Sequence, residues 1–339
     1  MKPIILSGHS RPVNKIKYNR DGDIFVSSGT DKICSLWYSE NGERIGTFEG
    51  HQGSVNSSDI NYDSTRLITG ASDSTACLWE LNTGKLIHKW EHKEIWSIKH
   101  VEFSLGDKLC LQVADSYQDI QSTIKIYDIF NEISQTPKLE IAYGQKSVKF
   151  TQASWGFLNE SILASDELGN LFKFDVETGK LLQKLSPHHK KIYSFSFDQN
   201  KISVVTASDD NSAKLFDYKT LTVRQTYNTN VPVRSATISP VLDQIAIAGG
   251  QAAKDVTTTR VDAAQFSVRL FHKVYGDEIA KIKGHFGPIH SLAYSPDGKQ
   301  LITSSEDSYI RINQFDPSYF EEFSIEKDID ELRLPEEKK

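Results

Sequence analysis

A pattern that recurs about every 42 residues constrains the fold of this chain more than any other feature. The dipeptide Gly-His occurs at 8–9, 50–51 and 284–285, and a branched aliphatic residue follows each histidine by four positions. A Ser/Thr-rich apolar run comes next, then an aspartate, then an alternating strand. In the first two copies a tryptophan follows the aspartate by six positions. A period of this length is typical of chains that stack copies of one small sheet.

Weaker copies at the same phase fill the gaps between the clear ones. The strand-terminal residues of all copies are Trp37, Trp79, Tyr127, Phe174, Phe216, Phe271 and Asn313. Successive steps are 42, 48, 47, 42, 55 and 42 residues, and the longest step reflects an insertion at 251–266. Because one short sheet cannot bury both of its apolar faces alone, we predict seven sheets that pack side by side around an axis.

Gly-His, Asp and Trp at these intervals resemble WD40 repeats, whose family forms four-stranded propeller blades. The resemblance implies an all-β, seven-bladed WD40 β-propeller over residues 1–316. Residues 2–6 are β-prone and precede the first Gly-His, so we expect this N-terminal strand to complete the last blade and cover its edge. Residues 317–339 carry eight acids and four bases, and we expect an acidic, partly disordered C-terminal tail.

The WD40 resemblance also implies a buried hydrogen-bonded tetrad of His, Asp, a Ser or Thr, and Trp in each regular blade. We assign to these tetrads His9, Asp31, Trp37, His51, Asp73, Trp79, His188, Ser208, Asp210, His285, Ser305 and Asp307. Ala71 stands at the position expected for the hydroxyl in blade two, and Asn313 replaces the tryptophan in blade seven, so both tetrads should be incomplete. We interpret these residues as structural rather than as catalytic His-Asp pairs.

Sequence motifs for common chemistry are missing. The chain has no Gly-rich phosphate loop, GxSxG elbow, HExxH helix or CxxC pair, so we expect no catalytic residue, metal or cofactor. Three cysteines cannot build a disulfide framework, and no apolar run approaches the length of a membrane span, which favours a cytoplasmic protein without direct membrane contact. Because the net charge is -6, we do not expect direct binding to nucleic acid.

Stretches outside the generic repeat resemble a narrower family, the i subunits of eukaryotic translation initiation factor 3. The matching stretches are Met1–Ile4, Ile16–Asn19, Trp37–Tyr38, Asn41–Arg44, Gly249–Gln251, Asp255–Thr259, Gly284–Ile289, Phe315–Asp316 and Tyr319–Phe320. The segment Ser304–Ser308 departs from the family's usual final blade.

This second resemblance implies a non-catalytic scaffold subunit that supports recruitment of mRNA and initiator tRNA to the small ribosomal subunit. It implies as partners the C-terminal helix of the b subunit, on blades five and six, and the g subunit. Asp217 matches an acid of that surface, whereas Asn200 stands where a second acid is expected.

Two other classes of function stay open. A WD40 substrate receptor or phosphopeptide-binding adaptor would need several Arg or Lys side chains on one face of the propeller. An enzyme would need clustered acids and a base at the mouth of the channel. Turns such as Asp31-Lys32 and Asp209-Asp210 are not consistently basic, which favours the scaffold.

Overall fold

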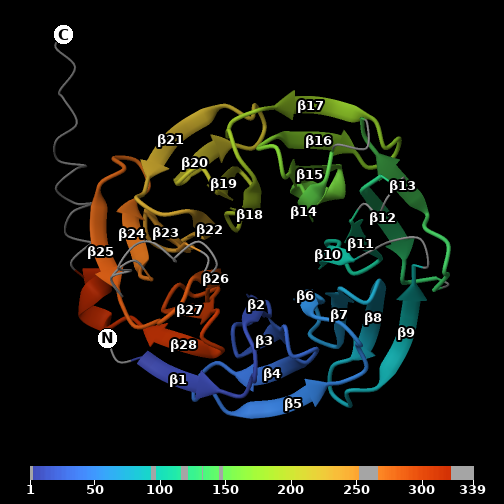
Figure 1. Cartoon of the computed structure of the whole chain (residues 1–339), viewed down its shortest axis with the longest axis horizontal. Helices are drawn as coiled ribbons and strands as arrows, with labels where there is room; N and C mark the ends of the chain where they lie inside the picture. The colour runs from blue at the N-terminus through green and yellow to red at the C-terminus, as the bar shows by residue number, and fades with distance from the viewer. Residues whose placement is uncertain are drawn as a thin grey trace, which may run out of the picture.

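Seven four-stranded antiparallel sheets form a closed ring in the computed structural model (Figure 1). The structure describes residues 3–92, 97–115, 121–131, 133–144, 148–251 and 266–321. Each blade runs from an inner strand at the central channel to an outer strand at the rim. The predicted seven-bladed propeller is thus confirmed.

The strands occupy equivalent positions in successive blades. The inner strands are β2 (Val13–Tyr18), β6 (Val55–Ile60), β10 (Ile98–Phe103), β14 (Phe150–Trp155), β18 (Ile192–Phe197), β22 (Val233–Ile238) and β26 (Ile289–Tyr294). The second strands are β3 (Ile24–Gly29), β7 (Arg66–Ala71), β11 (Leu109–Ala114), β15 (Ser161–Asp166), β19 (Ser203–Ser208), β23 (Gln244–Gly249) and β27 (Gln300–Ser305). The third strands are β4 (Cys34–Tyr38), β8 (Thr75–Glu80), β12 (Thr123–Asp128), β16 (Leu171–Asp175), β20 (Ser212–Asp217), β24 (Val268–His272) and β28 (Tyr309–Gln314).

The outer strands include one from the opposite end of the chain. They are β5 (Arg44–Phe48), β9 (Leu86–Glu91), β13 (Leu139–Ala142), β17 (Leu181–Leu185), β21 (Val223–Asn228), β25 (Glu278–Ile282) and, for blade seven, β1 (Pro3–Ser7). Strand β1 pairs with β28 from Pro3 opposite Asn313 to Ser7 opposite Tyr309. The expected closure by the N-terminal strand is confirmed.

The apolar core lies between the blades. Seven clusters of buried side chains each combine residues of two neighbouring blades, and the cluster that joins blades seven and one contains Leu6, Trp37 and Ile310. Every blade therefore depends on both neighbours for burial of its two faces. Cys34, Cys77 and Cys110 are free and buried.

Each inner strand contains a β-bulge at its second residue. The register against the second strand shifts there in all seven blades. A bulge leaves one residue outside the ladder and turns its side chain in a new direction. The bulge residues, here called the mouth ring, are Asn14, Asn56, Lys99, Thr151, Tyr193, Arg234 and His290.

The chain stays in contact with the propeller beyond the expected boundary at residue 316. Residues 317–321 are helical, and Tyr319 and Phe320 pack against the cluster between blades six and seven. The hydroxyl of Tyr319 donates to Gln244 Oε1 in blade six at 2.9 Å. Positions 322–339, with most of the expected tail, and 252–265 of the insertion lie outside the described residues.

A short 3-10 turn, Phe157–Asn159, links β14 to β15. Among the described residues, no helix is long and apolar enough to cross a membrane.

Candidate functional site

In four blades, a histidine lies in the loop that precedes the inner strand. One of its ring nitrogens contacts an aspartate in the turn after the second strand, and the other contacts a hydroxyl on the second strand. Nδ1 lies 2.8–3.2 Å from an aspartate oxygen in the pairs His9–Asp31, His51–Asp73, His188–Asp210 and His285–Asp307. Nε2 lies 2.7 Å from a hydroxyl in each case, on Ser27, Thr69, Thr206 and Thr303. The hydroxyl donates to Nε2, because Nδ1–H donates to the carboxylate.

The tryptophans complete two of these sets. The indole N–H of Trp37 donates to Ser27 at 2.8 Å, and that of Trp79 donates to Thr69 at 2.9 Å. The glycine before the histidine makes room for the indole: a Cβ on Gly8 would lie 2.6 Å from Trp37, and Gly50, at φ +154°, packs over Trp79. Gly-His and Trp are thus parts of one packing unit.

The hydroxyl assignment from sequence was wrong by two residues. Thr206 and Thr303, rather than Ser208 and Ser305, contact the histidines, and blade two is complete through Thr69 despite Ala71. Side chains two apart on a strand point to the same face, so alternation alone does not separate the two positions. The available signal was that a hydroxyl residue stands 18 positions after all four histidines, whereas position 20 holds Gly29 and Ala71 in blades one and two.

Ser208 and Ser305 instead stabilise the turn that follows them. The Ser208 hydroxyl donates to Lys190 O at 3.3 Å and accepts from the N–H of Asp210. Ser305 donates to Gly287 O at 3.0 Å and accepts from the N–H of Asp307. These bonds explain why both serines are fully buried without a histidine contact.

Blade seven lacks the tryptophan donor, as expected from Asn313. The Asn313 amide donates to Leu301 O at 3.1 Å and leaves Thr303 with His285 as its hydrogen-bond partner among the described residues. Phe216 occupies the same strand position in blade five and likewise carries no donor.

The electrostatics of the four aspartates agree with a structural role. Burial acts to raise the pKa of these carboxyl groups, but hydrogen bonds from the histidines, turn hydroxyls and backbone N–H groups outweigh it, so each pKa lies below its ordinary value. The pKa of His188 is lowered by burial despite Asp210. Donors and acceptors of these pairs are therefore occupied within the fold.

Asp217 and Asn200 lie at the same end of blade five. Asp217 ends β20 opposite Ser203, the first residue of β19, and Asn200 is exposed in the turn just before that strand. The Asp217 carboxylate accepts hydrogen bonds from Arg224, from the N–H groups of Lys219 and Thr220, and from the Thr220 hydroxyl. The hydrogen bond from Arg224, with those from Thr220, lowers the pKa of Asp217 to about 2.

The same turn recurs in neighbouring blades. Asp175 accepts from the N–H and hydroxyl of Thr178, both at 2.7 Å, and Asp128 accepts from two N–H groups after β12. A structural role thus accounts for the bonds of Asp217, and whether a partner also contacts it stays a prediction.

Exposed apolar side chains lie on blades five and six where these two blades meet, and sequence reasoning missed them. Val223 on β21 is 47% exposed, and Val274 and Tyr275, in the turn after β24, are 63% and 61% exposed. Gln225 Nε2 donates to Val274 O at 2.8 Å, which joins blades five and six at this edge. An aromatic residue in a turn, Tyr275, was the one signal in the sequence.

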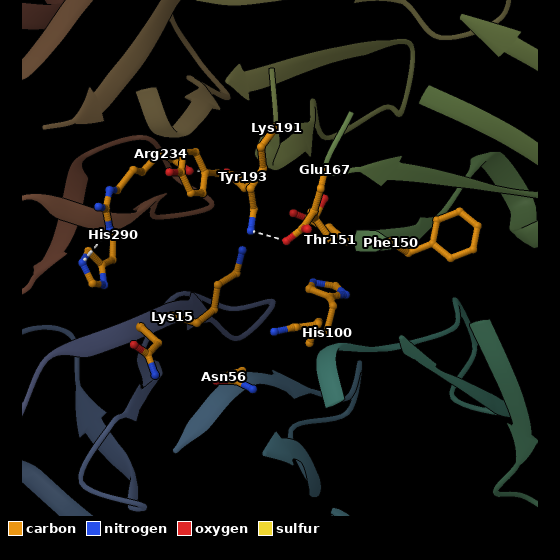
Figure 2. A pocket seen from close by; sticks show the side chains of 14 residues that line it. Lys15, Asn56, His100, Phe150, Thr151, Glu167, Lys191, Tyr193, Arg234 and His290 are labelled. Carbon is orange, nitrogen blue, oxygen red and sulfur yellow. Dashed lines mark hydrogen bonds and ion pairs between the residues drawn. The ribbon is translucent and has the colours of Figure 1, made fainter. Parts of the chain in front are cut away.

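A cavity of about 360 Å³ occupies one mouth of the central channel, and all seven mouth-ring residues are among those that line it (Figure 2). Lys99 forms an ion pair with Asp115 at 3.0 Å, and Lys191 forms one with Glu167 at 2.8 Å. Lysine and arginine side chains thus line this mouth of the channel. The turn sequences considered above, Asp31-Lys32 and Asp209-Asp210, did not predict them. No group of three metal-ligating side chains occurs within the described ranges.

Comparison with known proteins supplies the family. The family model described as EIF3I matches residues 1–326. Relatives named eukaryotic translation initiation factor 3 subunit I include those of Dictyostelium discoideum, 39% identical over 95% of this chain and 96% of the relative, and of Neosartorya fischeri, 38% identical over 98% and 100%. The Mus musculus relative is 38% identical over 95% and 98%. Because the match follows the whole propeller at this identity, the chain belongs to the family of eukaryotic translation initiation factor 3 subunit I.

Proposed function

We propose that this chain is a non-catalytic scaffold subunit of a eukaryotic translation initiation factor 3 complex in the cytoplasm. In this role it docks other subunits and thereby supports recruitment of mRNA and initiator tRNA to the small ribosomal subunit. Family membership along the whole propeller carries the proposal, since the matched relatives are named as subunits of that factor. The His-Asp pairs support the non-catalytic part, because their polar atoms are used to hold turns.

The edge between blades five and six is the docking surface that we propose for the C-terminal helix of the b subunit. Val223, Val274 and Tyr275 offer exposed apolar area there, and Asp217 adds a carboxylate that stays ionised at neutral pH. An amphipathic helix with one apolar face and a basic rim would complement such a surface. Asn200, close to Asp217 at this end of blade five, would add a polar contact rather than a second charge.

Binding of a synthetic peptide that spans the C-terminal helix of the b subunit tests this surface. We expect Asp217→Lys to weaken binding about tenfold or more, since it places a cation opposite the basic rim. Asp175→Lys is the matched control, because Asp175 makes the same turn contacts one blade away. Circular dichroism and thermal unfolding check that both variants fold alike. Equal affinity of the two variants would remove Asp217 from the interface.

Affinity purification of the tagged chain tests the wider role. Co-isolation with the b and g subunits and with small ribosomal subunits is the expected result. Co-isolation with cullin adaptors in place of these proteins would contradict the proposal and indicate a substrate receptor.

A further inference from the structure

The third strand of every blade ends at one equivalent position, and in blades one to six the chain turns there toward the outer strand. The occupants of this position in blades one to seven are Tyr38, Glu80, Asp128, Asp175, Asp217, His272 and Gln314. Aspartate thus opens the turn in three consecutive blades. Blade six has a histidine in its place, at the surface where we propose that the partner helix docks.

His272 makes the same backbone contacts as these aspartates. Asp217 accepts hydrogen bonds from the N–H groups of the residues two and three positions further along, both at 3.0 Å. His272 Nδ1 accepts from the N–H groups of Val274 and Tyr275, which stand at the same two positions, both at 3.2 Å. The imidazole nitrogen therefore takes the role of a carboxylate oxygen in the turn of blade six.

The residues held by these two hydrogen bonds are the exposed apolar residues of the docking surface. The His272 ring also stacks on Tyr275, with ring centroids 4.4 Å apart and planes inclined by 30°. Blade five anchors the start of the turn, since the Tyr227 hydroxyl donates to Lys273 O at 2.6 Å. His272 thus contacts both the backbone and the aromatic ring that present this apolar surface.

A histidine differs from an aspartate in the pH range over which it can accept such bonds. A carboxylate accepts at any pH above about 4, and the pKa values of Asp128, Asp175 and Asp217 are lowered further by their turn hydrogen bonds. An imidazole nitrogen accepts only while it carries no proton, and imidazoles ordinarily gain their second proton between pH 5 and 8. A protonated Nδ1 would face two N–H donors, so both hydrogen bonds would be lost.

The other charged side chains around the turn belong to classes that ordinarily titrate outside pH 5.5–7.5. On the turn, on the strands beside it, on blade five and on the C-terminal helix they are Lys273, Asp277, Asp243, Glu278, Asp217, Lys219, Arg224 and Glu321. Glu278 already pairs with Lys281 at 3.0 Å, and no ion pair reaches the His272 ring from the described residues. Residues 190–283 contain no second histidine. A change at this surface within that pH range therefore reports on His272.

We propose that His272 is a positioning residue of the docking surface between blades five and six, and that its protonation weakens docking of the partner helix. The inference rests on the docking function proposed above and adds a dependence on pH to it. While Nδ1 accepts, the turn presents Val274 and Tyr275 in one arrangement before the helix arrives. After protonation, the helix must order the turn on binding, which lowers its affinity.

Binding of the synthetic b-subunit helix peptide to the full chain at pH 7.5 and pH 5.5 tests the proposal. For the wild type we expect an affinity about fivefold lower at pH 5.5, because the turn has lost its hydrogen bonds. His272→Asp supplies the acceptor found in neighbouring blades, and its affinity should be equal at both pH values. His272→Leu removes the acceptor and should bind about fivefold more weakly than the wild type already at pH 7.5.

The same peptide is used throughout, so its own ionisation cancels between variants. His189→Asp is the matched control, because His189 is an exposed histidine at the opposite end of blade five, and this variant should keep the wild-type fall in affinity. An equal fall in His272→Asp and in the wild type would overturn the proposal. The same holds if His189→Asp abolishes the fall, or if His272→Leu binds as tightly as the wild type at pH 7.5.

Hydrogen–deuterium exchange of residues 272–277 separates this inference from the docking function. In the absence of peptide, the wild-type turn should exchange faster than the turn of His272→Asp at pH 5.5 and at a similar rate at pH 7.5. A peptide that binds to none of the proteins would contradict the docking function, and the exchange measurement would still decide the role of His272. Equal exchange of the two proteins at pH 5.5 would refute that role. Thermal unfolding checks that all variants fold alike.

Discussion

In four blades, a single hydroxyl on the second strand contributes to stability through its hydrogen bond to the histidine. Thr206 is buried, and its hydroxyl donates to His188 Nε2 at 2.7 Å. Removing one partner of a buried hydrogen bond leaves the other without compensation for its lost water. The loss of stability on removing a hydroxyl therefore depends on whether Thr206 or Ser208 contacts the histidine.

Thr206→Val is the sharpest test of that assignment. The substitution keeps the shape but removes the hydroxyl, and we expect it to lower the free energy of unfolding by about 1–3 kcal/mol. Ser208→Ala breaks only the two longer bonds of the turn and should cost less. Urea unfolding of both variants measures the difference. A larger loss for Ser208→Ala would restore the assignment made from spacing alone.

Asp73→Ala should destabilise blade two in a pH-dependent manner. Asp73 accepts hydrogen bonds from His51, Thr75 and the N–H of Gln52, so we expect a loss of about 1–3 kcal/mol at neutral pH. Because its pKa is depressed in the folded state, the stabilisation is present above the unfolded pKa of about 4 and is lost as the pH falls toward the folded value.

Thermal unfolding at pH 7 and near pH 3 measures this effect. The gap in melting temperature between wild type and Asp73→Ala should narrow at the lower pH. Asp63→Ala, at an exposed acid in the preceding turn, is the control and should show no gap. A gap for Asp73→Ala that is equal at both values would contradict an ionised, hydrogen-bonded carboxylate.

Among the strands, β1 is the one that protects the outer edge of blade seven. It covers β28, whose Ile310 and Ile312 are buried, and its own Leu6 enters the cluster between blades seven and one. Without β1, the edge of β28 would present unpaired backbone groups beside exposed apolar side chains, which favours intermolecular pairing.

A chain without residues 1–7 should therefore be poorly soluble and aggregate. Size-exclusion chromatography with light scattering measures the outcome. Ile5→Lys is a suitable control, since Ile5 is 53% exposed on the outer face and its replacement leaves the pairing intact. A monomeric, stable deletion would show that blade seven does not need this strand.

At the scale of the whole molecule, stability depends on closing the ring. Each of the seven apolar clusters joins two blades, and the cluster between blades seven and one is the one completed by both ends of the chain. Opening that interface exposes two blade faces at once. The pairing of β1 with β28 is thus a clasp for the entire propeller.

A disulfide across the clasp should stabilise the protein. Ser7 and Tyr309 face each other at the end of the β1–β28 pair, so Ser7→Cys with Tyr309→Cys should form a bond that closes a loop of nearly the whole chain. The chain-entropy model gives about 5–6 kcal/mol for a loop this long. The melting temperature should rise in the oxidised double variant and return after reduction, while each single variant stays unchanged. No rise on oxidation would argue against closure as the limiting step.

The repeat pattern alone was enough to predict the architecture. Seven copies of one pattern, with terminal positions from Trp37 to Asn313, predicted seven blades because each copy encodes the same local strand order and the same need for neighbours. The N-terminal strand was predictable for the same reason, since unit seven ran out of sequence before a fourth strand. His9 with Asp31, and His51 with Asp73, were predictable because their spacing repeats within one blade.

Which atoms meet, within a blade and between blades, depends on the packing in three dimensions. Thr206 and Ser208 share one face of a strand, and the depth of the His188 ring selects between them. Gly250 stands at the loop position where four other blades have an acid, and Arg234 meets His290 of the next blade only in the folded ring. Such contacts link residues far apart in the chain, so their chemistry depends on three-dimensional packing rather than on any local pattern.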